Sequence, residues 1–127
     1  MNLLRLLFFL AAQSGPTLAS PAADDPFKDL DCTKATVQIE LNYCANRDFE
    51  AADSKLNALY RGLFGQSDAK GRDRLKASER KWIAWRDKAC TVETASDAGG
   101  SIAPMEYSNC LTEKTKARIK ELARRPH

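Results

Sequence analysis

The amino-acid sequence predicts an all-α protein, an antiparallel bundle of about three helices with two disulfides. Apolar residues recur at three- and four-residue steps over three long segments, which is the pattern of a buried helix face. No segment shows the regular apolar–polar alternation of a half-buried strand. Four cysteines in a small chain that begins with an export signal favour disulfide bonds.

The first predicted helix runs from Val37 to Phe64, and the Thr36 hydroxyl is expected to cap its first turn. Its expected apolar face consists of Leu41, Ala45, Phe49, Ala52, Leu56, Leu59, Tyr60 and Leu63. Residues 65–71 contain two glycines, a serine and an aspartate, so they predict a turn.

Two further helices are predicted, from Arg72 to Thr94 and from Pro104 to Arg124. Proline suits the first turn of a helix, where its missing N–H is not needed. The expected inner-face residues are Leu75, Trp82, Trp85 and Ala89 on the second helix, and Tyr107, Leu111, Ile119 and Leu122 on the third. Helices with connections this short pack antiparallel to their neighbours in sequence.

The N-terminus predicts export. Residues 1–22 contain a basic start at Arg5, an apolar stretch, and then small residues and prolines, which is the order of a secretory signal peptide. We expect cleavage after Ala19 or Ala22. The apolar run is shorter than the roughly 18–20 residues that span a bilayer, so we expect no stable membrane insertion after cleavage. Residues 23–127 then form one periplasmic or secreted domain.

Composition argues against several classes of function. The chain has 20 basic and 17 acidic residues, and nucleic-acid binders usually carry a stronger basic bias. Its single histidine, His127, is the last residue, and neither a zinc-protease motif nor a phosphate-binding glycine loop is present. We therefore predict a protein that is not an enzyme, has no cofactor and does not bind nucleic acid.

The four cysteines allow three pairings. Cys90 and Cys110 flank the loop between the second and third helices, so they fall at similar heights on facing helices and are expected to pair. Cys32 must then pair with Cys44. One continuous helix would hold these two about 18 Å apart, so the segment before the first helix must fold back along it. A zinc site is not expected, because the spacings of 12, 46 and 20 residues lack the close pairs typical of structural zinc.

The sequence resembles the LprI-like lysozyme-inhibitor domain of bacterial envelope proteins, from Asp31 to Leu122. The residues that carry the resemblance are Asp31-Cys32, Gln38-Ile39-Glu40-Leu41-Asn42-Tyr43-Cys44-Ala45, Ala52-Asp53, Leu56-Asn57, Tyr60, Trp82-Ile83-Ala84-Trp85-Arg86-Asp87, Cys90, Gly99-Gly100-Ser101, Pro104, Cys110, Thr115, Arg118 and Leu122. One departure is Glu79, where such domains commonly carry Gln.

The resemblance implies a helical bundle and, for some members, inhibition of lysozyme. The leading hypothesis is thus an exported binding protein whose protein partner is lysozyme. The alternative is a structural or adaptor module of an envelope complex that never contacts lysozyme. Animal-type lysozymes are generally basic, and a mature domain of about +2 would not attract them over long range.

Two sets of residues are candidates for specific roles. The loop between the second and third helices offers a partner-binding site at Gly99, Gly100 and Ser101, with apolar contact from Tyr107, although it could also be a simple turn. A second set lies along the inner helix faces and is interpreted as a structural polar network rather than a binding patch. Its expected members are Asp53, Asn57, Tyr60, Arg86, Asp87 and Arg118.

Overall fold

The computed structural model describes residues 24–124, so the expected signal peptide and His127 lie outside the described residues. Three long helices, α1 (Gln38–Gln66), α2 (Ala69–Glu93) and α3 (Ala103–Ala123), form the domain. Two single-turn 3-10 helices, η1 (Cys32–Lys34) and η2 (Ala95–Asp97), precede α1 and α3. No strand occurs between residues 24 and 124, and the predicted all-α class is confirmed.

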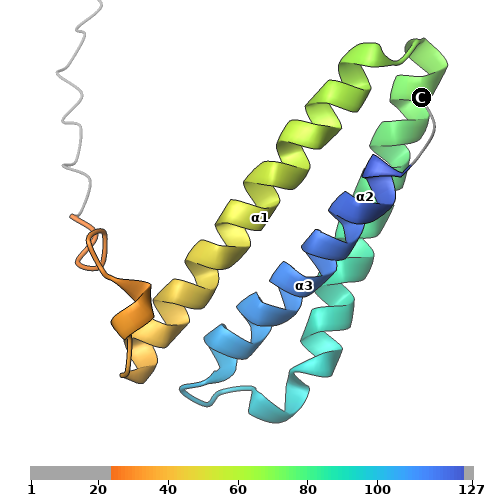
Figure 1. The fold of residues 1–127 in the computed structure, drawn as a ribbon. Helices are drawn as coiled ribbons and strands as arrows, with labels where there is room; N and C mark the ends of the chain where they lie inside the picture. The colour runs from red at the N-terminus through yellow and green to blue at the C-terminus, as the bar shows by residue number, and fades with distance from the viewer. Residues whose placement is uncertain (1–23, 125–127) are drawn as a thin grey trace, which may run out of the picture.

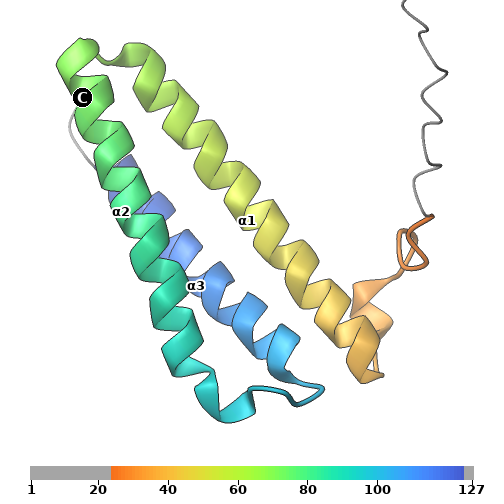
Figure 2. The ribbon, with the colours of Figure 1, turned by 180° about the vertical axis from the view of Figure 1, so that it is seen from behind.

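The helices run up, down and up. α1 and α2 form a long antiparallel hairpin, and α3 returns antiparallel to α2, in the same direction as α1 (Figure 1). α3 packs most extensively against α1 and less against α2, while α1 and α2 touch each other least. Seen from behind, α3 bridges the two longer helices (Figure 2). None of the helices in the described range has the length and apolar character of a membrane span.

The helix ends lie within three residues of their predicted positions, but two details differ. α1 continues to Gln66, and the turn is reduced to Ser67 and Asp68, whose carboxylate accepts a hydrogen bond from the Gly71 N–H at 2.7 Å and caps α2. At the start of α1 the expected Thr36 cap is wrong. Val37 occupies the N-cap position without a side-chain hydrogen bond, and the Thr36 N–H instead donates to Glu40 Oε2.

Both predicted disulfides are confirmed. Cys90–Cys110 joins the end of α2 to α3, and Cys32–Cys44 joins η1 to α1, each with a Cα–Cα distance of 5.7 Å. The segment before α1 folds back along the helix as the second pairing requires. It is held there by the Arg47 guanidinium, which donates to the Leu30 carbonyl at 3.0 Å.

The interior is thin and partly polar. Leu56 and Leu122 are fully buried, and Cys90, Cys110 and Leu111 form an apolar cluster against which Phe49 and Tyr107 pack. Between these apolar groups the buried residues include Glu79, Arg86, Ser108, Thr112, Thr115 and Arg118.

Trp85 does not belong to the inner face of α2, contrary to the prediction: it is 55% exposed. The inner positions at this level are occupied by Arg86 and by the half-buried Trp82. The inner face of α2 contains charged residues such as Arg86. A prediction based on apolar spacing therefore places Trp85 on that face instead of Arg86, the next residue. Trp85 is left on the flank of the helix.

Candidate functional site

The loop between α2 and α3 is ordered by its own backbone hydrogen bonds. η2 begins directly after α2, and successive backbone hydrogen bonds run from Asp97 N to Thr94 O, from Gly100 N to Asp97 O and from Ala103 N to Gly100 O. Gly99 has φ of +80°, a left-handed conformation that glycine adopts without strain. The backbone conformation at position 99 therefore favours glycine.

Asn42 of α1 holds the loop in place. Its side-chain amide donates to the backbone carbonyl of Ser101 at 2.9 Å, and its own oxygen accepts a hydrogen bond from Gln38 Nε2 at 2.8 Å. Gln38 also approaches the Met105 sulfur of α3 at 3.8 Å. The first turns of α1 thus brace the loop, a role that the sequence analysis did not assign to Asn42.

The loop leaves polar groups available to a partner. No hydrogen bond within residues 24–124 uses the backbone N–H of Gly99 or Ser101, or the Ser101 hydroxyl, and both residues are exposed. The Gly100 N–H, by contrast, is already bonded to the Asp97 carbonyl. Three donors of this exposed loop therefore have no hydrogen-bond partner among residues 24–124.

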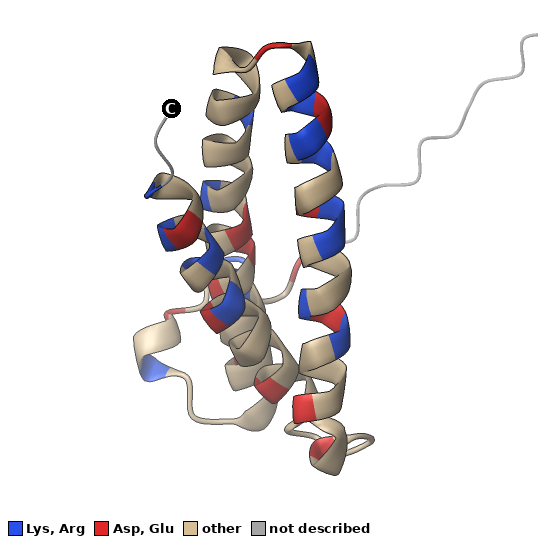
Figure 3. Ribbon diagram, turned by 90° about the vertical axis from the view of Figure 1, so that its right-hand side faces the viewer, with Lys and Arg blue, Asp and Glu red and all other residues tan. Residues whose placement is uncertain are grey.

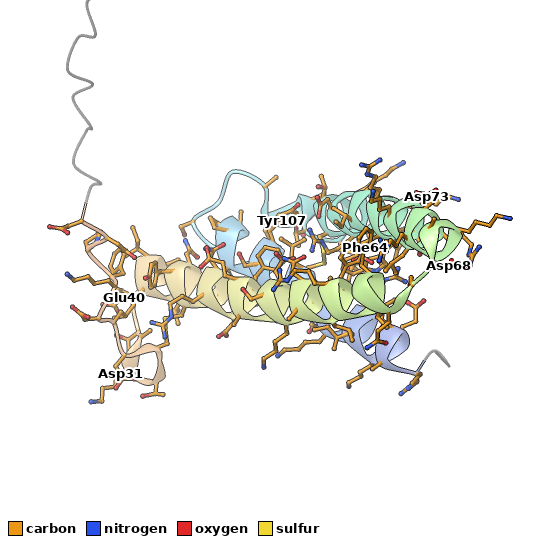
Figure 4. All side chains as sticks on the ribbon, turned by 90° about the horizontal axis from the view of Figure 1, so that it is seen from above. Asp31, Glu40, Phe64, Asp68, Asp73 and Tyr107 are labelled. Atoms are coloured by element: carbon orange, nitrogen blue, oxygen red, sulfur yellow. A yellow bond between two sulfur atoms is a disulfide. The ribbon has the colours of Figure 1, made fainter. Side chains whose placement is uncertain are left out.

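Tyr107 lies at the base of this loop. It is half-buried and packs on the Cys90–Cys110–Leu111 cluster. Figure 4 shows it among the side chains between the helices, well away from Asp31 at the N-cap of η1. Of the four loop candidates, Gly99, Gly100 and Ser101 lie together at the tip, and Tyr107 lies below them.

The predicted polar network forms around Arg86. Its guanidinium lies 2.9 Å from Asp87 and 3.6 Å from Asp53, and it donates to the Thr115 hydroxyl at 3.4 Å. Asn57 extends the network by donating to Asp53 at 3.1 Å. Arg86, Asp53, Asp87 and Asn57 therefore lie together in one network.

Arg118 belongs to a neighbouring cluster that the sequence analysis missed. Its guanidinium lies 3.2 Å from Glu79 Oε2 and also donates to Ser78 and Glu121. The two clusters meet at Trp82, whose ring centroid lies 5.2 Å from Arg86 Cζ and 5.6 Å from Arg118 Cζ.

Tyr60 takes no part in either cluster. Its ring instead stacks on Phe64, with a centroid separation of 6.0 Å. The charge of Arg118 faces Glu79 Oε2 directly, while Glu79 Oε1 is buried without a hydrogen-bond partner among the described residues. The carboxylate at position 79, which departs from the resemblance, was the sequence feature that could have indicated the Glu79–Arg118 pair.

Trp85 and Lys114 mark the flank between α2 and α3. The Lys114 ammonium is 2.8 Å from Glu93 and 5.4 Å from the Trp85 ring centroid. A shallow groove of about 510 Å³ lies beside them, lined by Trp82, Trp85, Glu113, Lys114, Ala117, Arg118 and Glu121.

A hydrogen bond also fixes the segment before α1. The Tyr43 hydroxyl donates to Asp25 Oδ2 at 2.7 Å. This bond lowers the pKa of the Asp25 carboxyl and raises the pKa of Tyr43. The Phe27 ring packs on Tyr43 with a centroid separation of 5.2 Å, so the segment adds to the same end of the bundle as the loop.

Charge is distributed unevenly along the bundle. On the loop side of the Cys90–Cys110 bridge, residues 24–50 and 90–110 contain ten acidic and three basic side chains. On the other side, residues 51–89 and 111–124 contain seven acidic and fifteen basic side chains. Figure 3 shows Lys and Arg concentrated on the part of α2 near its start and on the end of α3. The candidate loop therefore lies at an acidic end.

The profile of the family described as lysozyme inhibitor LprI matches residues 31–122. The chain belongs to the LprI family. An uncharacterized protein of Rhizobium meliloti is 37% identical to this LprI-family chain, in an alignment that covers 72% of this chain and 76% of that protein. No solved structure matches this chain.

Proposed function

We propose that this LprI-family domain is an exported, non-catalytic inhibitor of lysozyme that places the Gly99–Ser101 loop in the cleft of the enzyme. Two facts support the proposal: membership of a family described as lysozyme inhibitors, and a braced loop with unused hydrogen-bond donors at one end of the bundle. The two disulfides are consistent with a compartment outside the cytoplasm.

The chemistry of the loop complements that of the cleft. A lysozyme cleft contains two carboxyl groups that act on the glycosidic bond. The N–H groups of Gly99 and Ser101 and the Ser101 hydroxyl are donors, and hydrogen bonds to a carboxylate are stronger than those to a neutral acceptor. Because Asn42 holds the loop before binding, little conformational entropy is lost when the loop docks.

The acidic end removes the electrostatic objection raised by net charge. α1 contains 29 residues and is about 43 Å long, several times the roughly 8 Å Debye length at physiological salt. A partner that approaches the loop therefore senses the ten acidic and three basic groups at this end rather than the net charge of the whole domain. That local charge attracts a basic lysozyme.

A turbidity assay of cell-wall lysis tests whether inhibition exists. We expect the oxidised domain to slow lysis by at least one enzyme among animal-type, goose-type and invertebrate-type lysozymes. No slowing for any of the three at about tenfold molar excess would remove the inhibitor proposal. An adaptor role in an envelope complex would then be favoured.

A matched pair of variants tests the loop. Ser101→Ala removes the exposed hydroxyl, and Ser96→Ala removes an exposed hydroxyl from η2, in the same connection. We expect Ser101→Ala to weaken inhibition about three- to tenfold, the equivalent of one hydrogen bond, and Ser96→Ala to leave it unchanged. If Ser101→Ala inhibits lysozyme as strongly as Ser96→Ala, the Ser101 hydroxyl does not contact the enzyme.

A further inference from the structure

One flank of α2 carries a line of exposed cations. Lys70, Arg74, Lys81 and Lys88 follow each other at helical spacing, with Ala77, Ser78 and Ala84 between them. All four cations are exposed, and none forms an ion pair within residues 24–124. No acidic residue interrupts this line as far as Val92. The basic stripe, defined as Lys70, Arg74, Lys81 and Lys88, is thus free to meet an external anionic surface.

Exposed apolar side chains continue the same line. Trp85 lies between Lys81 and Lys88 and is 55% exposed, and Val92 follows one turn after Lys88 and is 67% exposed. A shallow depression of about 410 Å³ is lined by Trp85, Lys88, Ala89, Val92 and Glu93. The Lys114 ammonium lies 5.4 Å from the Trp85 ring centroid and 2.8 Å from Glu93 Oε1.

Cations and exposed apolar groups on one helix flank are typical of helices that lie on anionic bilayers. Lys and Arg are attracted to lipid phosphates, and tryptophan and aliphatic side chains enter the interface between headgroups and acyl chains. A soluble polyanion would use the four cations but would gain nothing from Val92. From Lys70 to Val92 the line is about 33 Å long. It can therefore contact a flat surface along its whole length rather than at a single position.

We propose that the basic stripe of α2, together with Trp85 and Val92, adsorbs the domain to an anionic phospholipid surface without inserting a helix. The loop at Gly99–Ser101 is not part of this line and stays available for a protein partner. This second surface is independent of the proposed inhibition, because its residues and its ligand differ from those of the loop.

Vesicle binding tests the proposal with a matched control. The oxidised mature domain is mixed with phosphatidylcholine vesicles, or with vesicles of equal parts phosphatidylcholine and phosphatidylglycerol, at low and at high ionic strength. We expect binding only to the anionic vesicles, with loss of binding at high salt. Each cation near the surface contributes about fivefold to partitioning, so Lys81→Gln with Lys88→Gln should weaken it about 30-fold. Lys55→Gln with Lys116→Gln removes two exposed lysines of α1 and α3 and serves as the control.

A spectroscopic measurement distinguishes entry of Trp85 into the bilayer interface from electrostatic attraction of the cations alone. Tryptophan fluorescence should shift to shorter wavelength with anionic vesicles, and the shift should disappear in Trp85→Phe, which keeps all four stripe cations. Equal weakening by the two charge-removal pairs would overturn the stripe as the site. Binding to heparin but not to anionic vesicles would overturn the membrane as its ligand.

Discussion

At the scale of single residues, the interior of this LprI-family domain depends on two arginines. The side chain of Arg118 is 4% exposed and faces Glu79, and that of Arg86 is 8% exposed and faces Asp53 and Asp87. Both guanidinium groups also lie against Trp82. A charged pair in an interior adds little net stability but penalises any packing that separates its members. These contacts therefore fix the register of the helices more than they stabilise the fold.

Replacing Arg118 should expose this dependence. Arg118→Met leaves the Glu79 carboxylate buried opposite an apolar side chain, and we expect the free energy of unfolding to fall by about 3–5 kcal/mol. Adding Glu79→Leu to that variant should restore most of the loss. Urea denaturation followed by circular dichroism measures both effects. A double variant no more stable than Arg118→Met would show that Glu79 does not need its partner.

Asn42 links the fold to the proposed site. Asn42→Ala removes the hydrogen bond to the Ser101 carbonyl and releases the loop, so inhibition should weaken about three- to tenfold. Asn46→Ala, one turn later on α1, removes only an exposed hydrogen bond to Glu50 and is the control. If both variants inhibit as well as the unmodified domain, the bracing of the loop is irrelevant to binding.

At the scale of elements, the two disulfides have different roles. Cys90–Cys110 closes the α2–α3 hairpin between two buried cysteines, whereas Cys32–Cys44 attaches the half-buried Cys32 of the segment before α1 to the buried Cys44 of α1. Removing the first by Cys90→Ser with Cys110→Ser should lower the free energy of unfolding of the bundle by about 3 kcal/mol.

Removing the second disulfide should have a local effect. In Cys32→Ser with Cys44→Ser we expect the segment before α1 to detach while α1, α2 and α3 stay folded. Residue-resolved hydrogen exchange measures the loss of protection in this segment and the retained protection in the three helices. Loss of protection throughout α3 in this variant would contradict the separation of roles.

The helices and the disulfide pairings could be predicted from the sequence because both depend on local spacing. Apolar steps located α1 and α3 well, and the short loop between α2 and α3 placed Cys90 opposite Cys110. The inner face of α2 could be predicted from apolar spacing only in part: Arg86, which was expected on the inner face as part of a polar network, is buried, but Trp85 is exposed. Pairing partners such as Glu79 for Arg118 depend on contacts between helices, which periodicity in one helix does not reveal.

The loop was predicted only in part, for a similar reason. The glycines at 99 and 100 indicated a special backbone, and Gly99 has the positive φ that explains one of them. The bracing by Asn42 comes from 59 residues away in the sequence, so no local pattern could indicate it.

At the scale of the whole molecule, the separation of charge matches the two proposed partners to different regions. The loop end is acidic and suits a basic enzyme, while the exposed stripe of α2 is basic and suits an anionic surface. Attraction over distance is screened by salt. The association rate with a basic lysozyme should therefore fall as ionic strength rises, as measured by stopped-flow fluorescence. A rate that increases with salt would mean that the basic part of the domain faces the enzyme.

The proposal that the loop occupies the lysozyme cleft is tested most directly by steady-state kinetics with a soluble chitooligosaccharide, which removes the cell wall from the assay. If Gly99 and Ser101 occupy the cleft, increasing amounts of the domain should raise the apparent KM of the lysozyme and leave kcat unchanged. Ser101→Ala should raise the inhibition constant without changing this pattern. A fall in kcat at constant KM would show that the domain binds outside the cleft and would contradict the account.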